Sequence, residues 1–290
     1  MFDARQIKIY NIYQRRRSLN KVITEKQDLT YLTWSHVRSS SGTAGTFLKS
    51  QSLVSGEKIY YKLSNFDSEK GVIGHECVNE IIVDRLLTVL GVPHLEYQLI
   101  HADIEVEGKV YDTWLCASKD FKQRGESKAA LDNYYQVNKE AEETRYDFCV
   151  KNGWKKHIDT MLVVDYLILN RDRHGANVEV LRDARKRTIR IAPLFDYGLS
   201  FLCSCYNEEE IKKFDILEDK PCQNFIGSRS TYENLVFVEN KKGIFPNALK
   251  LEDKEILLAD LDSVLSETHL DKIWNMLWAR WCEYEKLCNL

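Results

Sequence analysis

The chain has 290 residues, 44% of them hydrophobic and 29% charged, and its 41 basic and 44 acidic residues leave a formal net charge of −3. A chain of this length and apolar content can bury the core of one two-lobed unit or of two small domains. The nearly balanced charge excludes an overall electrostatic field that would attract nucleic acid or an anionic membrane.

The sequence carries no sign of export or membrane insertion. Residues 1–20 alternate charges with tyrosines and contain no secretory hydrophobic region, and no apolar run approaches the about 18 residues of a membrane span. The eight cysteines are scattered, which is typical of reduced, mostly buried thiols rather than of disulfides or a metal cluster. We therefore expect a cytoplasmic protein, or one delivered into a host cell as an effector.

A loop rich in serine and glycine is expected near the amino end. It reads Ser39-Ser-Ser-Gly-Thr-Ala-Gly45. Small side chains let backbone amides approach phosphate oxygens closely. The candidate nucleotide contacts are Ser41, Gly42, Thr43, Ala44 and Gly45. The residue order differs from that of a Walker P-loop, and a flexible loop without a ligand is the alternative.

A lysine stands in the middle of the short β-rich run Ile59-Tyr-Tyr-Lys62-Leu. Because a buried cation needs an anionic partner, Lys62 must either face solvent on an edge strand or meet anions. The acidic motifs further along the chain favour the second interpretation, in which Lys62 contacts the phosphates of a nucleotide.

The clearest helix of the first half spans residues 76–90, where apolar residues recur at helical spacing until Gly91 and Pro93 end it. Glu76 and Glu80 lie on one face of this helix. At least one of them should border the core, with Lys62 as its candidate partner. We prefer Glu80 because it lies deeper in the helix, but the pattern does not decide between the two.

Two strands are predicted at residues 95–100 and 109–116, with a polar turn over residues 101–108 between them. The second strand leads into a charged stretch, so residues 114–118 are the predicted hinge between two lobes. The backbone of Leu115, Cys116 and Ala117 would there contact the edge of the nucleotide base. An ordinary strand end is the alternative.

Residues 126–156 are polar and mostly helical in propensity, and a nearly apolar helix over residues 158–169 follows, which indicates a buried element. It carries the polar loop Asn170-Arg-Asp172-Arg-His174-Gly-Ala-Asn177. A predicted hairpin then ends in Ala192-Pro-Leu-Phe-Asp196-Tyr-Gly198. Asp165, within the helix, is expected to be structural.

These polar residues form the set that phosphoryl transfer requires. One carboxylate must face the acceptor hydroxyl, and an amide and a second carboxylate must hold Mg²⁺ on the nucleotide phosphates. Asp172, Asn177 and Asp196 could instead each be a capping or turn residue. That alternative needs three separate explanations, whereas a single active site accounts for all three residues. We therefore favour the active site.

The carboxy-terminal part is predicted to contain helices over residues 251–267 and 270–287. The second carries Trp274, Trp278 and Trp281 on one face. We interpret this stripe as a packing face that closes the lobe rather than as a ligand platform.

The two polar motifs resemble those of the HipA-like family, bacterial serine/threonine kinases that keep eukaryotic kinase chemistry on a reduced scaffold. The resemblance covers residues 39–201 and includes Lys62, the helix at 76–90 and the serine-rich loop. It implies an α+β, two-lobed protein-kinase-like fold. A small β-rich amino-terminal lobe would span residues 1–120, and a mainly helical carboxy-terminal lobe would span residues 121–290.

The resemblance also implies roles for individual residues. Asp172 would be the catalytic base, Asn177 and Asp196 the Mg²⁺ ligands, and Lys62 the contact to the phosphates of ATP. His174 would orient the loop through its ring nitrogens or contact the transferred phosphate. Autophosphorylation of the serine-rich loop would switch activity off by displacing it from the nucleotide, with Ser39, Ser40 and Ser41 as candidates.

The leading interpretation is an ATP- and Mg²⁺-dependent kinase that phosphorylates Ser or Thr on a protein substrate. A phosphoinositide or small-molecule kinase is the first alternative, although the acidic run Glu208-Glu-Glu210 stands where an anionic lipid would dock. A nucleotide-binding pseudokinase that acts as an interaction module is the second, although competent residues occupy all the chemical positions. Because the chain starts almost directly at the kinase core, a compact stand-alone kinase is expected over one that binds an antitoxin.

Overall fold

The computed structural model describes residues 21–35 and 47–289. The strands are β1 (Val22–Asp28), β2 (Lys49–Val54), β3 (Glu57–Leu63), β4 (Phe66–Asp67), β5 (Gly71–Val72), β6 (Tyr97–Val106), β7 (Lys109–Lys119), β8 (Glu126–Ala130), β9 (Asp172–Arg173), β10 (Glu179–Asp183), β11 (Thr188–Ile191) and β12 (Gln223–Asn224). The helices are α2 (Glu76–Leu90), α3 (Leu131–Asn138), α4 (Arg145–Lys151), α5 (Lys155–Leu167), α6 (Glu208–Lys213), α7 (Thr231–Phe237), α8 (Lys254–Leu257) and α9 (Glu267–Cys288), with 3₁₀ turns η1 (Gly175–Asn177) and η2 (Leu251–Asp253). None of the helices in the described ranges is long and apolar enough to cross a membrane.

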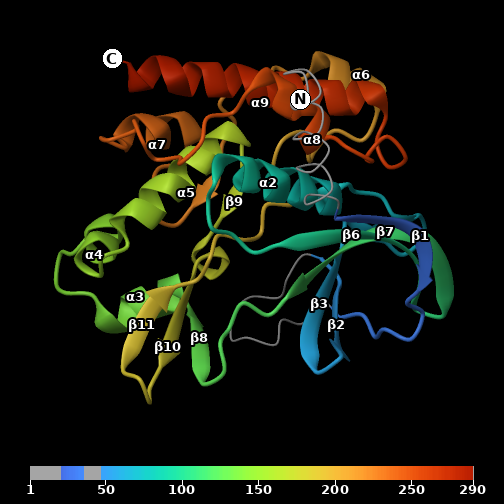
Figure 1. The fold of residues 1–290 in the computed structure, drawn as a ribbon, viewed down its shortest axis with the longest axis horizontal. Helices are drawn as coiled ribbons and strands as arrows, with labels where there is room; N and C mark the ends of the chain where they lie inside the picture. Colours follow the sequence, from blue (N-terminus) through green and yellow to red (C-terminus); the bar gives the residue numbers. More distant parts are fainter. Residues whose placement is uncertain (1–20, 36–46, 290) are drawn as a thin grey trace, which may run out of the picture.

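The first half of the chain forms a five-stranded sheet in the order β1-β6-β7-β3-β2. Its strands run antiparallel except for the parallel pair β1 and β6. Helix α2 lies against this sheet and ends at Gly91, whose positive φ of 75° lets its N–H bond back to Leu87 and Thr88 carbonyls. Figure 1 shows the sheet on one side of the molecule and the smaller sheet with α3 and α4 on the other.

The β6–β7 hairpin is longer than the sequence predicts. Strand β6 continues through the expected polar turn to Val106, and the chain reverses only at Glu107 and Gly108, which both have positive φ. The polar residues of this part still alternate with buried Ala102 and Ile104. His101 also stacks on Trp114 of β7 at 4.8 Å between ring centroids. Cross-strand contacts therefore stabilise β6 beyond residue 100, where the prediction from residue polarity ended the strand.

The second half is mainly helical, but it contains a three-stranded sheet in the order β11-β10-β8. Strand β8 lies in the stretch that was expected to be mostly helical. Its pairing with β10 overrides the local helical propensity, and residues close to β8 in sequence do not reveal this pairing. The predicted helix 251–267 was also wrong. Only η2 and the short α8 form there, and Asp260 has a positive φ of 60° that no helix interior accepts.

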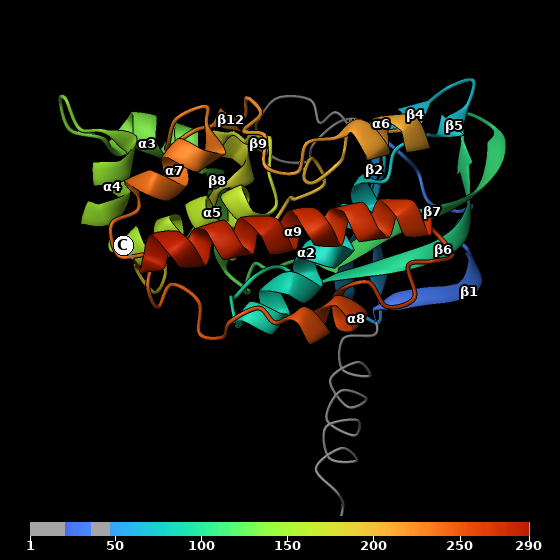
Figure 2. The same cartoon turned by 90° about the horizontal axis from the view of Figure 1, so that it is seen from above.

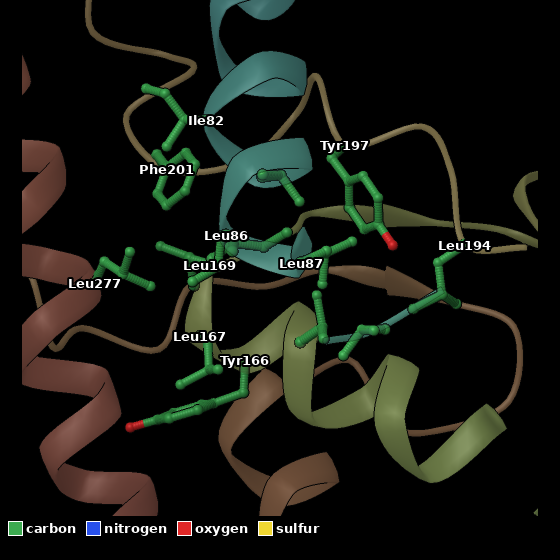
Figure 3. Close-up of a cluster of buried hydrophobic side chains, with 14 of the residues drawn as sticks. Ile82, Leu86, Leu87, Tyr166, Leu167, Leu169, Leu194, Tyr197, Phe201 and Leu277 are labelled. Atoms are coloured by element: carbon green, nitrogen blue, oxygen red, sulfur yellow. The ribbon is translucent and has the colours of Figure 1, made fainter. Parts of the chain in front are cut away.

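One hydrophobic core runs through both halves of the molecule. Residues of α2, such as Ile82 and Leu86, pack with Leu167 of α5 and Leu277 of α9 (Figure 3). Helix α9 passes over α2 in both ribbon views (Figure 2). Trp274 and Trp281 are buried in this core, which confirms the tryptophan stripe as a packing face. Helix α2, which carries Glu80, is therefore fixed against the helical half as well as against the sheet.

Two buried histidines meet where α2 and α9 begin. The rings of His75 and His269 lie edge to face with centroids 4.5 Å apart. Burial lowers the pKa of His75 to about 3 and that of His269 to about 4. Both side chains are therefore neutral in the folded protein at neutral pH, whereas in the unfolded chain they take up protons below a pKa of about 6.5.

The unfolded chain thus binds more protons between pH 6.5 and about 4, so the free energy of unfolding should fall as the pH falls through this window. Replacing one histidine should remove up to about 1.4 kcal/mol per pH unit of this slope. We expect a shallower pH dependence for His269→Phe, which keeps an aromatic ring against His75. Urea unfolding at several pH values between 7 and 4.5 measures the slope, and equal slopes in the variant and the wild type would contradict the prediction.

Candidate active site

A buried lysine joins the sheet, α2 and the segment after β11. The Nζ atom of Lys62 lies 3.0 Å from Oε1 of Glu80 and 2.6 Å from Oδ1 of Asp196. The side chain of Glu80 is fully buried, and that of Lys62 is 12% exposed. Burial disfavours the charged lysine, but the carboxylates of Asp196 and Glu80 outweigh it and raise the pKa of Lys62 well above its usual value. Lys62 is therefore a permanent cation held between two anions.

The two glutamates of α2 have different partners. Glu80 binds Lys62, as preferred from the sequence, and its two carboxylate oxygens also accept the N–H groups of Tyr197 and Gly198. Glu76 is equally buried, but its Oε2 accepts the N–H of Asn65, in the turn after β3. Of these two glutamates, Glu80 is therefore the one whose contacts, within the described residues, join Lys62 to the segment that carries Asp196.

This difference predicts unequal effects of the same substitution. For the phosphate transfer expected from the sequence, Glu80→Gln should lower kcat/KM by about 10²-fold, since it removes the charge that positions Lys62 and weakens the contacts to the Asp196 segment. Glu76→Gln should leave kcat/KM within about threefold, because its contact is to a backbone amide outside this network. Steady-state kinetics of the two variants makes the comparison, and similar losses for both would contradict the assignment.

The Asp-x-Gly segment, residues 196–198, packs closely against α2. Asp196 adopts a positive φ of 62°, and Nδ2 of Asn79 donates to the carbonyls of Gly198 and Ser200. A Cβ atom at Gly198 would lie 3.0 Å from Cβ of Glu76 and 3.4 Å from Nζ of Lys62. Glycine is therefore needed at this position because any side chain would push against the helix and the lysine.

Asp172, the predicted catalytic base, lies on a different element from Lys62, Glu80 and Asp196. Asp172 begins β9, which pairs in parallel with β12. Nδ1 of His174 accepts the N–H of Ala176, so the proton of a neutral ring sits on Nε2, which lies 3.7 Å from Oδ2 of Asp172. Desolvation raises the pKa of Asp172, and the negative charge of Asp196 adds to this effect. His174 and the positive charge of Lys62 lower the pKa but do not cancel the rise. A partly desolvated carboxylate of this kind is a better proton acceptor than an exposed one.

Asn177 completes the polar group. Its Nδ2 donates to the backbone carbonyl of Asp172 at 2.9 Å. Its Oδ1 is buried and has no hydrogen-bond partner in the part of the chain that the structure describes. A buried amide oxygen fixed in this way fits a hard divalent cation such as Mg²⁺. No group of three His, Cys, Asp or Glu residues suited to a metal occurs within the described ranges, so a metal here would need further oxygens from its ligand.

Arg173, which was not predicted from the sequence to belong to the site, organises this loop. Its guanidinium is buried and binds both carboxylate oxygens of Asp165, at 3.0 and 2.9 Å. It also donates to the backbone carbonyls of Asn177 and Phe195. Asn177 is itself a candidate metal ligand, and Phe195 directly precedes the other one, Asp196. A signal was available, because a carboxylate inside an apolar helix such as Asp165 requires a buried cation, and Arg173 is close in sequence.

A cavity of about 560 Å³ has Lys62, Cys116 and Asp196 among the residues that line it. Ala176 of the loop after α5 also lines it, whereas Asp172, His174 and Asn177 do not. Leu115 and Ala117 belong to a second hydrophobic cluster, together with Leu63 and Ile104, and residues 115–117 are paired with both β3 and β6. Of the three residues predicted to contact a base, Cys116 lines the cavity, and Ser118, Lys119, Asp120 and Phe121 line it further along the chain.

The serine-rich loop lies outside the described residues. This applies to the candidate nucleotide contacts Ser41, Gly42, Thr43, Ala44 and Gly45 and to the candidate phosphorylation sites Ser39, Ser40 and Ser41. The site as described thus consists of Lys62, Glu80, Asp172, His174, Asn177 and Asp196, to which the structure adds Arg173 and Asp165.

Solved structures with a similar fold were found, although the sequence comparisons found no relative. No protein-family model matches the chain, and no curated protein matches it significantly. The crystal structure of a proinflammatory kinase of Helicobacter pylori, CtkA, matches with a TM-score of 0.63 and 17% sequence identity, over 91% of this chain and 97% of CtkA. HipA of Shewanella oneidensis, in a complex with HipB and operator DNA, matches with a TM-score of 0.45 and 13% identity, over 97% of this chain and 72% of HipA.

The first of these matches spans nearly the whole of both chains, and at 17% identity it concerns the fold alone. It confirms the α+β, two-lobed kinase-like fold predicted from the sequence. The expected resemblance to HipA-like kinases is confirmed as a resemblance in fold: the chain has the fold of the CtkA kinase of H. pylori.

Proposed function

We propose that this protein is an ATP- and Mg²⁺-dependent kinase that phosphorylates Ser or Thr on a protein substrate and also phosphorylates itself. The observation that carries the proposal is the ion-pair network of Lys62, Glu80 and Asp196, of which Lys62 and Asp196 line the cavity. The kinase-like fold supports the same conclusion. The lobes would meet near residue 120, where β7 ends.

Each residue of the site would have one task. The carboxylate of Asp172 would accept the proton of the acceptor hydroxyl, and His174, whose Nε2 lies 3.7 Å from Oδ2 of Asp172, would orient the loop. Lys62 would exchange its contact with Asp196 for oxygens of the α- and β-phosphates and keep its contact with Glu80. Positioning and electrostatics would supply most of the rate enhancement.

Asn177 and Asp196 would hold the metal. The amide oxygen of Asn177, which has no hydrogen-bond partner among the described residues, and the carboxylate of Asp196 are the kinds of oxygen ligand that Mg²⁺ prefers. Mg²⁺ bound there would neutralise charge on the phosphates. Arg173 would keep both ligands in register, since it bonds to the carbonyl of Asn177 and to that of Phe195, next to Asp196.

The proposal is tested by incubating the purified chain with labelled ATP and Mg²⁺, with and without a generic protein acceptor, and mapping the modified residues by mass spectrometry. We expect phosphoserine or phosphothreonine on the acceptor and on the chain, and no label when Mg²⁺ is chelated. Label on phosphoinositide vesicles alone would replace the protein substrate by a lipid. Nucleotide binding without any phosphate transfer would show a pseudokinase.

A further inference from the structure

Another carboxylate residue, to which no role has been assigned so far, lines the cavity. Glu179 is the first residue of β10, two positions after Asn177, and its side chain lines the same cavity as Lys62. The residue is 8% exposed. One of its oxygens, Oε1, accepts a hydrogen bond from Nζ of Lys128 on β8, at 3.2 Å.

The other oxygen of Glu179 has no such contact. Oε2 is buried and lacks a hydrogen-bond partner among residues 21–35 and 47–289. A buried carboxylate oxygen without a donor is costly, and most buried polar atoms in native proteins are satisfied by protein, water or ligand. Glu126, on the neighbouring strand, shows the usual arrangement, because Arg190 donates to both of its oxygens.

The surroundings of Glu179 suit the nucleoside half of a nucleotide. The rings of Phe121 and Phe195 line the same cavity with centroids 5.5 Å apart, and Nζ of Lys128 lies 5.9 Å from the centre of the Phe121 ring. Aromatic walls favour a flat base, and a few fixed polar groups among them give a pocket its specificity. Since Lys128 is a donor, Glu179 is the acceptor of this pair.

We propose that Glu179 is a specificity-determining residue of the nucleotide cleft, and that its Oε2 accepts a hydrogen bond from a donor group of the nucleoside. The donor is either the amino group of the base or a hydroxyl of the ribose, which share this chemistry. The inference rests on the proposed function, because it takes the cavity to be the ATP site.

The test couples a change in the protein to a change in the ligand. Binding to wild type and to Glu179→Leu is measured by calorimetry for ATP, 2′-deoxy-ATP, 3′-deoxy-ATP and purine riboside triphosphate, which lacks the amino group. In the wild type we expect one analogue to bind about tenfold more weakly than ATP. Glu179→Leu should bind ATP and that analogue equally. Loss with a deoxy analogue assigns the ribose, and loss with purine riboside triphosphate assigns the base.

Two further variants separate recognition from structure. Glu126→Gln, in a glutamate whose oxygens are both bonded, should keep the wild-type discrimination. If Glu179→Leu is poorly folded, the double variant Glu179→Leu, Lys128→Met replaces the pair by apolar groups and should also show no discrimination. The same discrimination among the analogues in wild type and in the Glu179 variants overturns the inference, as does a wild type that binds no nucleotide.

These measurements also distinguish this inference from the proposed function. Binding is recorded without phosphate transfer. A wild type that binds ATP with the expected coupling to Glu179 but transfers no phosphate leaves this inference standing while the kinase proposal fails. Phosphate transfer without the coupling to Glu179 leaves the kinase proposal standing while this inference fails.

Discussion

Asp172→Asn is expected to lower kcat for phosphate transfer by about 10³-fold while the protein still folds and binds ATP. The amide keeps the shape of the side chain but cannot accept the proton of the acceptor hydroxyl, and loss of a positioned general base costs about 10²- to 10⁴-fold in rate. Among the described residues no group donates a hydrogen bond to the carboxylate of Asp172, and this side chain is 29% exposed. The fold should therefore tolerate the substitution.

The measurement for Asp172 needs rate, binding and stability on the same preparation. Single-turnover phosphate transfer gives the rate, calorimetry gives the affinity for ATP, and thermal unfolding checks the fold. Asp67→Asn, at the last residue of β4, makes the same chemical change away from the site and should retain the wild-type rate. An Asp172→Asn protein with more than a tenth of the wild-type rate would remove Asp172 from its assigned role.

The part of the site that depends on spacing could be predicted from the sequence. Asp172, Asn177 and Asp196 stand at intervals set by one loop and one hairpin, and Lys62 and Glu80 follow from the need to pair a buried lysine with a helical carboxylate. The rest depends on pairings between distant segments. Strand β8 exists because it pairs with β10, and the side of β7 that faces the cavity is fixed by the register with β3.

The orientation of single groups was also beyond the sequence. Glu76 and Glu80 share a helix face, and only the path of the segment after Asp196 decides that Glu80 meets Lys62 while Glu76 meets Asn65. The role of Glu179 likewise depends on where β8 places Lys128. Periodicity gives the face on which a residue lies, but it does not give the partner that another segment brings to that face.

Asp165→Asn is expected to lower the free energy of unfolding by about 3–5 kcal/mol, the largest stability effect that we predict. Asp165 and Arg173 are both buried, with side chains 2% and 1% exposed. Removing one partner of a buried ion pair leaves an uncompensated charge, which costs far more than the pair itself contributes. Arg173 would then also lose the anchor that aims it at the carbonyls of Asn177 and Phe195.

Urea unfolding at neutral pH measures this loss, and Glu209→Gln provides the control. Glu209 pairs with Lys213 on α6, but both side chains are about three-quarters exposed, at 76% and 74%, so its loss should stay within about 0.5 kcal/mol. The double variant Asp165→Leu, Arg173→Met removes both charges and should recover part of the stability while phosphate transfer stays low. A stability recovered together with full activity would mean that Arg173 does not align the metal ligands, and a change of under 1 kcal/mol for Asp165→Asn would mean that the pair is not buried as described.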